Sequence, residues 1–282
     1  MINKELSIII TAYRKVELLE LCINSIRKNI DNKINYEIIV ADSDTNESTM
    51  DLMKEKFSDV TFIPNKKNVG FGRVANQGIA RAKGEYLFII NHDIIIKDEA
   101  IQKLLIFLKD NKDVGLVAPR LINFDGKVQL SAFKFYRPLT ILFRRTFLKN
   151  TSFGKKYLNK FLLKDKIFKN KVIDVDWVMG SAMMVSRESI DKVGVFDNKF
   201  FMYFEDVDWC RRFWENGYRV VYNPTVTIAH YHGKASENKG VLQAVLLNKY
   251  TRIHIKSAMI YFWKYFGKKD PHRAYYNKVN IK

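Results

Sequence analysis

The chain has 282 residues, of which 47% are hydrophobic and 28% are charged. This composition is typical of a folded globular protein and excludes an intrinsically disordered chain. The formal net charge is +18. Most of the excess lies in residues 134–171, with 12 Lys and Arg against one Asp, and in residues 234–282, with 11 Lys and Arg against two acids. We expect these two segments, rather than the core, to face a partner.

The first 120 residues alternate apolar runs with segments of helical periodicity. We expect strands at residues 6–12, 36–42, 60–65, 85–91 and 114–119. We expect helices at residues 16–30, 48–57, 73–84 and 99–111, with Ser48 and Asp98 as N-caps of the second and the last. This alternation predicts an α/β fold with a mostly parallel sheet and helices on both faces. Such sheets bind ligands at the carboxyl ends of their strands.

After Pro119 the alternation stops. Residues 134–171 mix aromatic and basic residues without a clean period, whereas residues 175–188 and 219–224 are strand-like. Helical spacing returns at residues 205–217 and 241–267. The best apolar face of the last helix comprises Leu242, Val245, Leu246, Lys249, Ile253, Lys256 and Ile260. We expect one domain with a basic helical C-terminal extension.

Cys22 and Cys210 both lie in helical patterns among apolar residues. We interpret them as reduced core thiols of a cytosolic protein. The N-terminal stretch has only a short apolar run with an acid before it, which indicates a buried strand rather than a signal peptide. No stretch reaches the roughly 18 apolar residues that a membrane span needs.

Polar residues follow two of the expected strands. Asp42 ends one strand, and Asn91, His92 and Asp93 end another. An Asp at such an edge can hold a divalent cation against phosphate oxygens. From spacing alone, a turn that uses Asn and Asp for backbone hydrogen bonds is the simpler explanation of residues 91–93.

Residues 201–218 place three acids directly behind a run of aromatic residues. In a helix that begins near Glu205, Asp206 heads an apolar stripe that points inward, while Glu205 and Asp208 lie on the other face, where we interpret them as helix caps. A buried carboxylate that stays ionised at the positive end of a helix suits a general base. Capping is an equally good explanation of Asp206. The rest of its stripe is Cys210, Phe213, Trp214 and Gly217.

Two further motifs are weaker. His230 and His232 would share one face of a strand and can bind a metal there, although structural histidines are at least as good an explanation. Gly70 and Gly72 precede a helix without forming a dinucleotide-binding fingerprint, so a tight turn is the default explanation.

Taken in order, these segments resemble the bacterial glycosyltransferase family 2 enzymes, in particular their rhamnosyltransferase-like subset. The resemblance covers roughly residues 5–233. The matching segments are "SIIITAY" (7–13), "IIVADSDTNEST" (38–49), "NVGFGRVANQGI" (68–79), "AKGEYLFIINHD" (82–93), "DWVMGSAMMVSRE" (176–188) and "FFMYFEDVDWCRRFWENGYRVVYNPTVTIAHYHG" (200–233).

The resemblance implies a Rossmann-like GT-A domain over residues 1–233, with a nucleotide-sugar-binding half at 1–120 and an acceptor-binding half at 121–233. Residues 234–282 would be a basic amphipathic helical extension. The implied donor-binding residues are Thr11, Tyr13, Asp42, Asn68, Arg73, Asn91, His92 and Asp93. The implied acceptor-binding residues are Trp177, Met179, Gly180 and Glu205. Phe201, Tyr203, Trp177 and Trp209 could offer flat faces to sugar rings or pack in the core.

The resemblance also implies an inverting glycosyltransferase. Asp206 matches the base that deprotonates the acceptor hydroxyl. Asp93 and His230 match the ligands of a Mg²⁺ or Mn²⁺ ion that neutralises the leaving diphosphate. The first acid of the family's metal motif is Asn91 here, so a single carboxylate remains and the donor's diphosphate would complete the coordination.

The implied donor is a dTDP- or UDP-sugar, with dTDP-rhamnose favoured by the subset, and the implied acceptor is a glycan or a polyprenyl-pyrophosphate-linked precursor. Residues 251–282 interleave basic and aromatic side chains, as interfacial helices do, which suggests peripheral attachment to the anionic inner face of the cell membrane. A solvated basic helix, or one that joins a homodimer, is the alternative.

Two other functions stay open. Basic segments with interleaved aromatics also occur in nucleic-acid-binding proteins, but the sequence has no signature of such a domain, and we expect no nucleic acid partner. A non-catalytic nucleotide-sugar binder would explain the replacement of an acid by Asn91.

Overall fold

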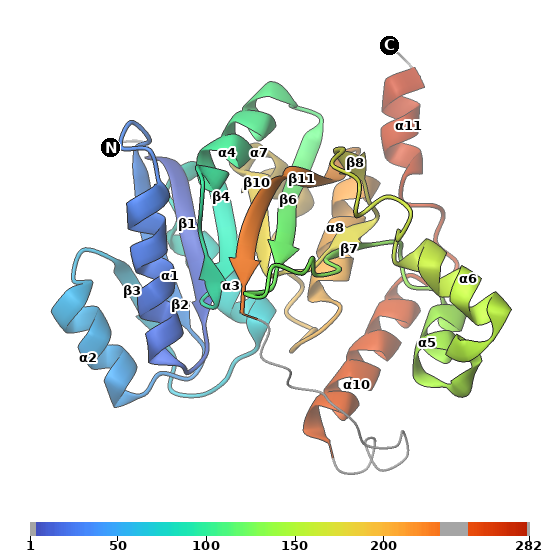
Figure 1. Ribbon diagram of the computed structural model, residues 1–282, viewed down its shortest axis with the longest axis horizontal. Helices are drawn as coiled ribbons and strands as arrows, with labels where there is room; N and C mark the ends of the chain where they lie inside the picture. Colours follow the sequence, from blue (N-terminus) through green and yellow to red (C-terminus); the bar gives the residue numbers. More distant parts are fainter. Residues whose placement is uncertain (1–3, 232–247, 281–282) are drawn as a thin grey trace.

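The computed structural model describes residues 4–231 and 248–280, and Figure 1 shows their arrangement. The helices are α1 (Val16–Asn29), α2 (Glu47–Lys56), α3 (Phe71–Arg81), α4 (Ala100–Asp110), α5 (Pro138–Arg145), the 3-10 helix η1 (Phe147–Asn150), α6 (Ser152–Phe161), α7 (Arg187–Val193), α8 (Glu205–Glu215), α10 (Lys249–Lys264) and α11 (Arg273–Asn280). The strands are β1 (Lys4–Ala12), β2 (Tyr36–Asp42), β3 (Thr61–Pro64), β4 (Gly84–Asn91), β5 (Ile94–Ile95), β6 (Val114–Ile122), β7 (Ala132–Phe133), β8 (Ile173–Asp174), β9 (Trp177–Val178), β10 (Ala182–Ser186) and β11 (Arg219–His230).

A mixed sheet forms the centre of the molecule. Within the described residues its strands follow the order β3-β2-β1-β4-β10-β6-β11-β5, and β8 pairs with β11 outside this path. The strands β3, β2, β1 and β4 are all parallel, and β6 is parallel to β11. β10 runs antiparallel to both β4 and β6 between these two groups. The predicted α/β class and the order of the first strands and helices are confirmed.

Helices cover both faces of the sheet, which explains the unbroken apolar runs of the inner strands. In β1, Ile8 and Ile10 point into a core shared with α1, α2 and α4. Ile9 points to the opposite core, which α3, α7, α8 and α10 complete. The period of two along a strand sends alternate residues to opposite layers. Cys22 and Cys210 are free buried thiols, one in each core, as expected.

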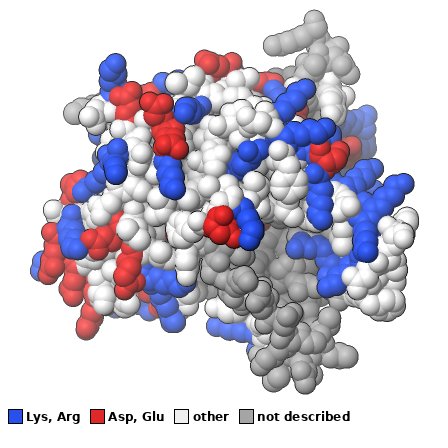
Figure 2. Space-filling view, viewed as in Figure 1, with Lys and Arg blue, Asp and Glu red and all other residues white. Residues whose placement is uncertain are grey.

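The basic segment 134–171 contains two helices that were not predicted. α5 and α6 lie at the opposite end of the molecule from α2 (Figure 1). In α6 only Gly154 and Phe161 are buried, and the apolar residues Phe153 and Tyr157 precede Phe161 at helical spacing. Figure 2 shows Lys and Arg side chains gathered at this end, whereas acids and bases are mixed over α1 and α2.

The predicted apolar face of the C-terminal helix is wrong. α10 begins at Lys249, and residues 241–247 of the expected helix lie outside the described part of the chain. Lys256 is exposed, and the buried face instead comprises Ser257, Ala258, Tyr261 and Tyr265. The ring of Tyr261 lies 5.3 Å from that of Phe204, at the start of α8. The helix is therefore docked against the domain core and is not a separate appendage.

Two predicted helix caps are also wrong. Asn46, not Ser48, caps α2 by accepting a hydrogen bond from the Thr49 N–H at 2.9 Å. α4 begins after Asp98 and Glu99, which both have positive φ, and its N-cap position has no side-chain hydrogen bond. The backbone turn fixes that start in place of a side chain.

Candidate active site

Three polar residues meet at the carboxyl edge of the parallel strands. Thr11 pairs in register with Asn91, and Ala12 pairs with Asp42. The Thr11 hydroxyl donates to Asn91 Oδ1 at 3.1 Å and lies 3.2 Å from the Ile90 carbonyl oxygen. The expectation that the ends of β1, β2 and β4 form one edge is therefore confirmed.

Asp42 is fully buried at the end of β2, and its Oδ2 atom has no hydrogen-bond partner within residues 4–231 and 248–280. Next to it, Ser43 Oγ donates to Asn68 Oδ1 at 3.1 Å. Asn68 Oδ1 also accepts the Gly70 N–H at 2.9 Å and so shapes the turn into α3. A buried carboxylate oxygen without a partner is a candidate acceptor for a ligand N–H.

Tyr13 and Arg73, which were also predicted to bind the donor, differ in burial. Tyr13 is half-buried after β1, and Arg14 stacks on its ring at 5.1 Å. Arg73 is exposed on α3 and donates to the Asn198 carbonyl at 3.1 Å, so its guanidinium ties α3 to the loop after α7.

Asp93 and His230 face each other beyond β4, with Oδ1 and Nε2 separated by 3.3 Å. His230 Nδ1 lies 2.7 Å from Gln129 Oε1, which fits a proton on Nδ1 and turns Nε2 toward Asp93. Burial raises the pKa of Asp93, but the hydrogen bond and charge of His230 and the charge of His92 outweigh it and hold the pKa below its ordinary value. The Asp93 carboxylate is therefore ionised at neutral pH.

A divalent cation fits this arrangement. Mn²⁺ accepts both a carboxylate oxygen and an imidazole nitrogen as ligands, so it can take the place of a proton between Asp93 Oδ1 and His230 Nε2. Among the described residues, Asp93 Oδ1 has no partner besides His230, and His92 Nε2 is buried without a hydrogen-bond partner. No third His, Cys, Asp or Glu joins this pair among the described residues. Asn91 Oδ1 accepts from Thr11, so Asp93 and His230 are the candidate metal ligands at this edge among the described residues.

Asp206 lies beside the same edge. Its Oδ2 accepts the Gly180 N–H at 3.2 Å, and its Oδ1 accepts the Val207 N–H at 2.8 Å. The next residue, Ser181, accepts the Asn91 N–H through its carbonyl oxygen at 3.0 Å. Gly180 and Ser181 thus connect the half-buried Asp206 carboxylate to the end of β4, two residues before Asp93.

Glycine is needed at this junction. A Cβ on Gly180 would press on the ring of Phe71 at 3.0 Å and reach Cβ of Asp206 at 3.7 Å. Gly70 has φ +88°, and a Cβ there would overlap the carbonyl oxygen of Phe201. The start of α3 and the start of α8 therefore approach each other as closely as backbone allows.

The acidic cluster at the start of α8 differs from the prediction. Glu205 and Asp208 are 5% and 0% exposed, so they are core residues and not exposed helix caps, and α8 has no side-chain cap. Asp206 is the least buried of the three. The prediction followed helical periodicity, which could not show that α10 covers the second face of α8.

The two adjacent acids at the start of α8 titrate above their ordinary range. Burial, with the nearby Asp206 charge, raises the pKa of Glu205 well above its ordinary value. Burial also raises the pKa of Asp206 to about 6, although the Val207 and Gly180 N–H groups oppose the shift. At neutral pH, Asp206 is therefore mostly ionised. Its pKa lies close to the working pH, which suits a general base.

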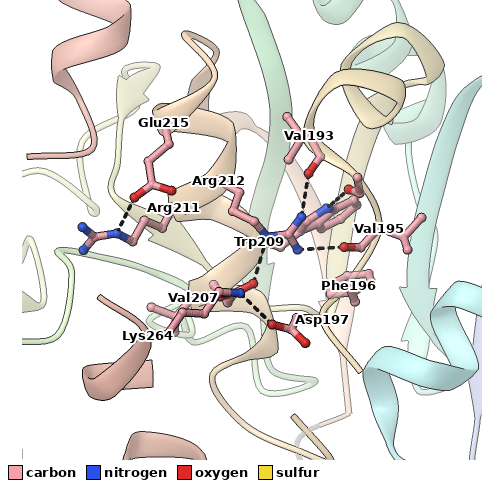
Figure 3. Close-up of polar contacts among 12 residues, drawn as sticks. Val193, Val195, Phe196, Asp197, Val207, Trp209, Arg211, Arg212, Glu215 and Lys264 are labelled. Atoms are coloured by element: carbon pink, nitrogen blue, oxygen red, sulfur yellow. Dashed lines mark hydrogen bonds and ion pairs between the residues drawn. The ribbon is translucent and has the colours of Figure 1, made fainter. Parts of the chain in front are cut away.

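The charge of Asp208 is compensated by three partners, one on α8 and two at the end of α10. It accepts from Arg212 Nε at 2.9 Å and from the Tyr265 hydroxyl at 2.8 Å, and it lies 2.6 Å from Lys264 Nζ. Figure 3 shows Lys264 also reaching Asp197 and Arg212 reaching the carbonyls of Val193 and Val195. This network clamps α8 to α10 and to the loop after α7.

The predicted aromatic platforms separate into two groups. Trp209 and Trp177 are buried, and the Trp177 ring stacks on Phe133 at 4.4 Å, so both pack in the core. Met179 and Phe201 are half-buried, and Tyr203 is exposed beside the start of α8. Only the second group retains surface for a sugar ring.

A comparison with protein families decides the identity. The model of the family "Glycosyl transferase family 2" matches residues 7–194. The chain belongs to glycosyl transferase family 2. It is therefore an enzyme that transfers a sugar from a nucleotide-sugar donor.

Relatives of this glycosyltransferase include three rhamnosyltransferases. The N-acetylglucosaminyl-diphospho-decaprenol L-rhamnosyltransferase of Mycobacterium tuberculosis is 24% identical over 80% of this chain and 76% of its own length. Rhamnosyltransferase WbbL of Escherichia coli is 28% identical over 68% of this chain and 69% of its own. The dTDP-rhamnosyl transferase RfbF of Shigella flexneri is 26% identical over 72% of this chain and 62% of its own length. The predicted rhamnosyltransferase-like resemblance is confirmed.

Solved structures agree on the GT-A fold. GalNAc-T7 with UDP, GalNAc and Mn²⁺ superposes with a TM-score of 0.61 at 13% identity, over 99% of this chain and 54% of its own. The mannosyltransferase PcManGT of Pyrobaculum calidifontis, in complex with GDP-Man and Mn²⁺, superposes with a TM-score of 0.56 at 15% identity. The match covers 99% of this chain and 80% of that protein. In the described part of this glycosyltransferase, no helix is long and apolar enough to cross a bilayer.

Several residues of the site carried no signal in the sequence. Gln129, which orients His230, lies in a loop before β7, and Phe71 resembles any apolar helix residue. Lys264, which compensates Asp208, lies in a segment that we expected to face a partner. Only contacts between distant parts of the chain identify these three. His232 lies outside the described residues.

Proposed function

We propose that this glycosyltransferase moves a sugar, with rhamnose from dTDP-rhamnose as the first candidate, to a hydroxyl of a lipid-linked glycan precursor with inversion at the anomeric carbon. The observation that supports this most directly is the half-buried Asp206 carboxylate, one hydrogen bond from Gly180 and close to the end of β4. The sugar and the acceptor are suggested by relatives named for rhamnosyl transfer and for a diphospho-decaprenol acceptor.

In this mechanism Asp206 accepts the proton of the acceptor hydroxyl as the oxygen attacks the anomeric carbon. The N–H groups of Gly180 and Val207 hold the two carboxylate oxygens, so the carboxylate is oriented before the acceptor binds. Asp93 and His230 would hold Mg²⁺ or Mn²⁺, which stabilises charge on the departing diphosphate. Asp42 Oδ2 and the loop of Asn68 would contact the nucleoside. One base and one displacement need no nucleophilic carboxylate.

A thermal-shift panel of nucleotide sugars, with and without Mn²⁺, tests the donor. A ligand that binds only the folded state raises the melting temperature by mass action, so the true donor gives the largest shift. Asp206→Asn should keep this shift and lose transfer to the acceptor. Transfer by Asp206→Asn at the wild-type rate would contradict the assignment. A donor shift without turnover by the wild-type chain would favour a non-catalytic binder.

We also propose that the enzyme attaches peripherally to the anionic inner face of the cell membrane. On α10 and just after it, Trp263 is 87% exposed and Phe266 is 89% exposed, and both lie among basic residues. Phe147 and Phe153, on η1 and α6, are exposed at the same end of the molecule (Figure 1). Exposed aromatic side chains next to Lys and Arg favour an anionic bilayer surface.

Vesicle flotation tests this attachment. The wild-type chain should float with phosphatidylglycerol vesicles and much less with phosphatidylcholine vesicles. Trp263→Ser with Phe266→Ser should abolish flotation, while Leu21→Ser with Ile106→Ser, on helices α1 and α4, should not. Equal flotation of both double variants would refute the proposal. Loss of a dimer in light scattering, with flotation unchanged, would instead assign this face to a second copy.

A further inference from the structure

A cavity of about 680 Å³ opens between α5, α6, the middle of α8 and the segment that joins α10 to α11. It is separate from the strand edge that carries Asp93. The basic residues that line it come from different parts of the fold and are Lys134, Arg137, Lys160, Arg211, Lys268 and Lys269. Its only acids are Asp176 and Asp270, so the lining has a clear positive excess within the described residues.

The acids of the cavity are already compensated. Asp176 accepts from the Phe135 N–H at 2.7 Å and from Lys134 Nζ at 2.9 Å, and it lies 3.4 Å from His272 Nε2. Asp270 lies 2.7 Å from the other ring nitrogen of His272. Asp176 therefore pairs with Lys134 and His272, and Asp270 pairs with His272. Within the described residues, neither carboxylate pairs with the other basic residues that line the cavity.

Arg211 is the buried anchor of this set. Its guanidinium lies 4.0 Å from the Tyr265 ring, donates to Glu215 at 3.0 Å and donates to the Lys269 carbonyl at 3.3 Å. Figure 3 shows the pairing of Arg211 with Glu215 along α8. Arg137, Lys160, Lys268 and Lys269 have no ion pair with any described carboxylate. Several uncompensated cations around one hollow repel each other unless an anion binds.

The cavity is close to the candidate base. Tyr136, which lines the cavity, has its ring 4.8 Å from the ring of Phe204, two residues before Asp206. Asp176 precedes Gly180 by four residues through β9, which spans at most about 14 Å. A head group in which a sugar is joined to a phosphate can bridge separations of this order. The exposed Phe266 precedes Lys268 by two residues, so the cavity also lies beside the apolar surface of α10.

We propose that this cavity binds the phosphate or diphosphate group of the acceptor while the acceptor sugar reaches Asp206. This inference rests on the proposed function, because it assumes an acceptor that carries phosphate. Arg137, Lys160 and Lys269 donate to the phosphate oxygens, while Arg211, paired with Glu215, forms the α8 side of the cavity. Charge-assisted hydrogen bonds of this kind are the usual means of holding phosphate in proteins.

Calorimetric titration of the full chain with farnesyl diphosphate, inorganic pyrophosphate and farnesol tests the site, with EDTA present so that no metal-bound diphosphate forms. The test variant is Lys160→Gln with Lys269→Gln. The matched control is Lys155→Gln with Lys156→Gln, which removes the same charge from exposed positions of α6 that do not line the cavity. We expect about a tenfold rise in Kd for both diphosphates in the test variant, and less than twofold in the control.

The three probes identify the source of the phosphate. Tighter binding of farnesyl diphosphate than of pyrophosphate, with no binding of farnesol, supports a lipid-borne diphosphate. Equal binding of the two diphosphates supports the site but assigns it to a soluble phosphate group. Equal Kd values in the wild type and both variants would overturn the proposal, as would binding of farnesol as tight as that of farnesyl diphosphate.

Failure of this inference is distinguishable from failure of the proposed function. The donor-induced thermal shift with Mn²⁺ should be the same in the wild type and in both Lys variants. In turnover, the test variant should raise the KM for a diphosphate-bearing acceptor about tenfold with kcat and the donor KM unchanged. A missing donor shift in the wild type would count against the proposed function instead.

Discussion

Replacing Asp206 by Asn should inactivate the enzyme and stabilise its fold at the same time. Asn has the same shape but does not take up a proton at this pH, so loss of general-base catalysis should lower kcat by about 10²- to 10⁴-fold. Asn also carries no charge, so it removes the cost of holding an ionised carboxylate in a partly buried site.

The magnitude follows from the pKa. Burial raises the pKa of Asp206 from 3.8 to about 6. A shift of this size destabilises the folded state by about 3 kcal/mol above pH 6, where both states are ionised. Asn cannot accept both the Gly180 and the Val207 N–H groups, and the lost hydrogen bond costs about 1 kcal/mol. The net gain is about 2 kcal/mol at pH 7.5, or roughly 4 °C in melting temperature.

The stability difference between Asp206→Asn and the wild type should decrease as the pH falls. Because the folded pKa is raised, the cost of the wild-type carboxylate disappears as pH falls from about 6 toward 3.8. The stability difference measured by urea unfolding should therefore shrink to below about 1 kcal/mol at pH 5. Asp208→Asn is the control on the same helix and should lose about 3–5 kcal/mol, because it leaves Lys264 and Arg212 without their buried carboxylate. A destabilised Asp206→Asn variant at pH 7.5 would refute the reasoning.

Three further outcomes are expected. The value of kcat/KM should fall about tenfold per pH unit below about pH 6 as Asp206 becomes protonated, and a flat profile down to pH 5 would exclude it as the base. Gly70→Ala should lower the free energy of unfolding, measured in urea, by more than about 2 kcal/mol, because the new Cβ meets the Phe201 carbonyl. Gly126 also has positive φ but has open space around it, so Gly126→Ala should lower it by less. His230→Ala should raise the Mn²⁺ concentration for half-maximal donor-induced thermal shift about tenfold or more, and an unchanged concentration would remove this residue from the metal site.

Much of the fold follows from local pattern. β1, β2 and β4 are buried on both faces, so they require continuous apolar runs that are visible in any window of the sequence. Their carboxyl ends share one edge because parallel strands must, which is why Asp42 and Asn91 were candidates before any coordinates. The helices α5 and α6 were not predicted, although α6 places Phe153, Tyr157 and Phe161 at helical spacing.

The residues at the start of α8 show what only the tertiary structure decides. Helical spacing distinguishes two faces of α8 but does not reveal that α10, about fifty residues later, covers the second one. That cover buries Asp208 and brings Lys264 to it, while Asp206 stays accessible beside Gly180. The sequence by itself determined the sheet, the family and the residues at the strand ends. Which acid remains open to a substrate, and which cations surround a cavity, depended on packing between segments far apart in the chain, and no local pattern encodes that packing.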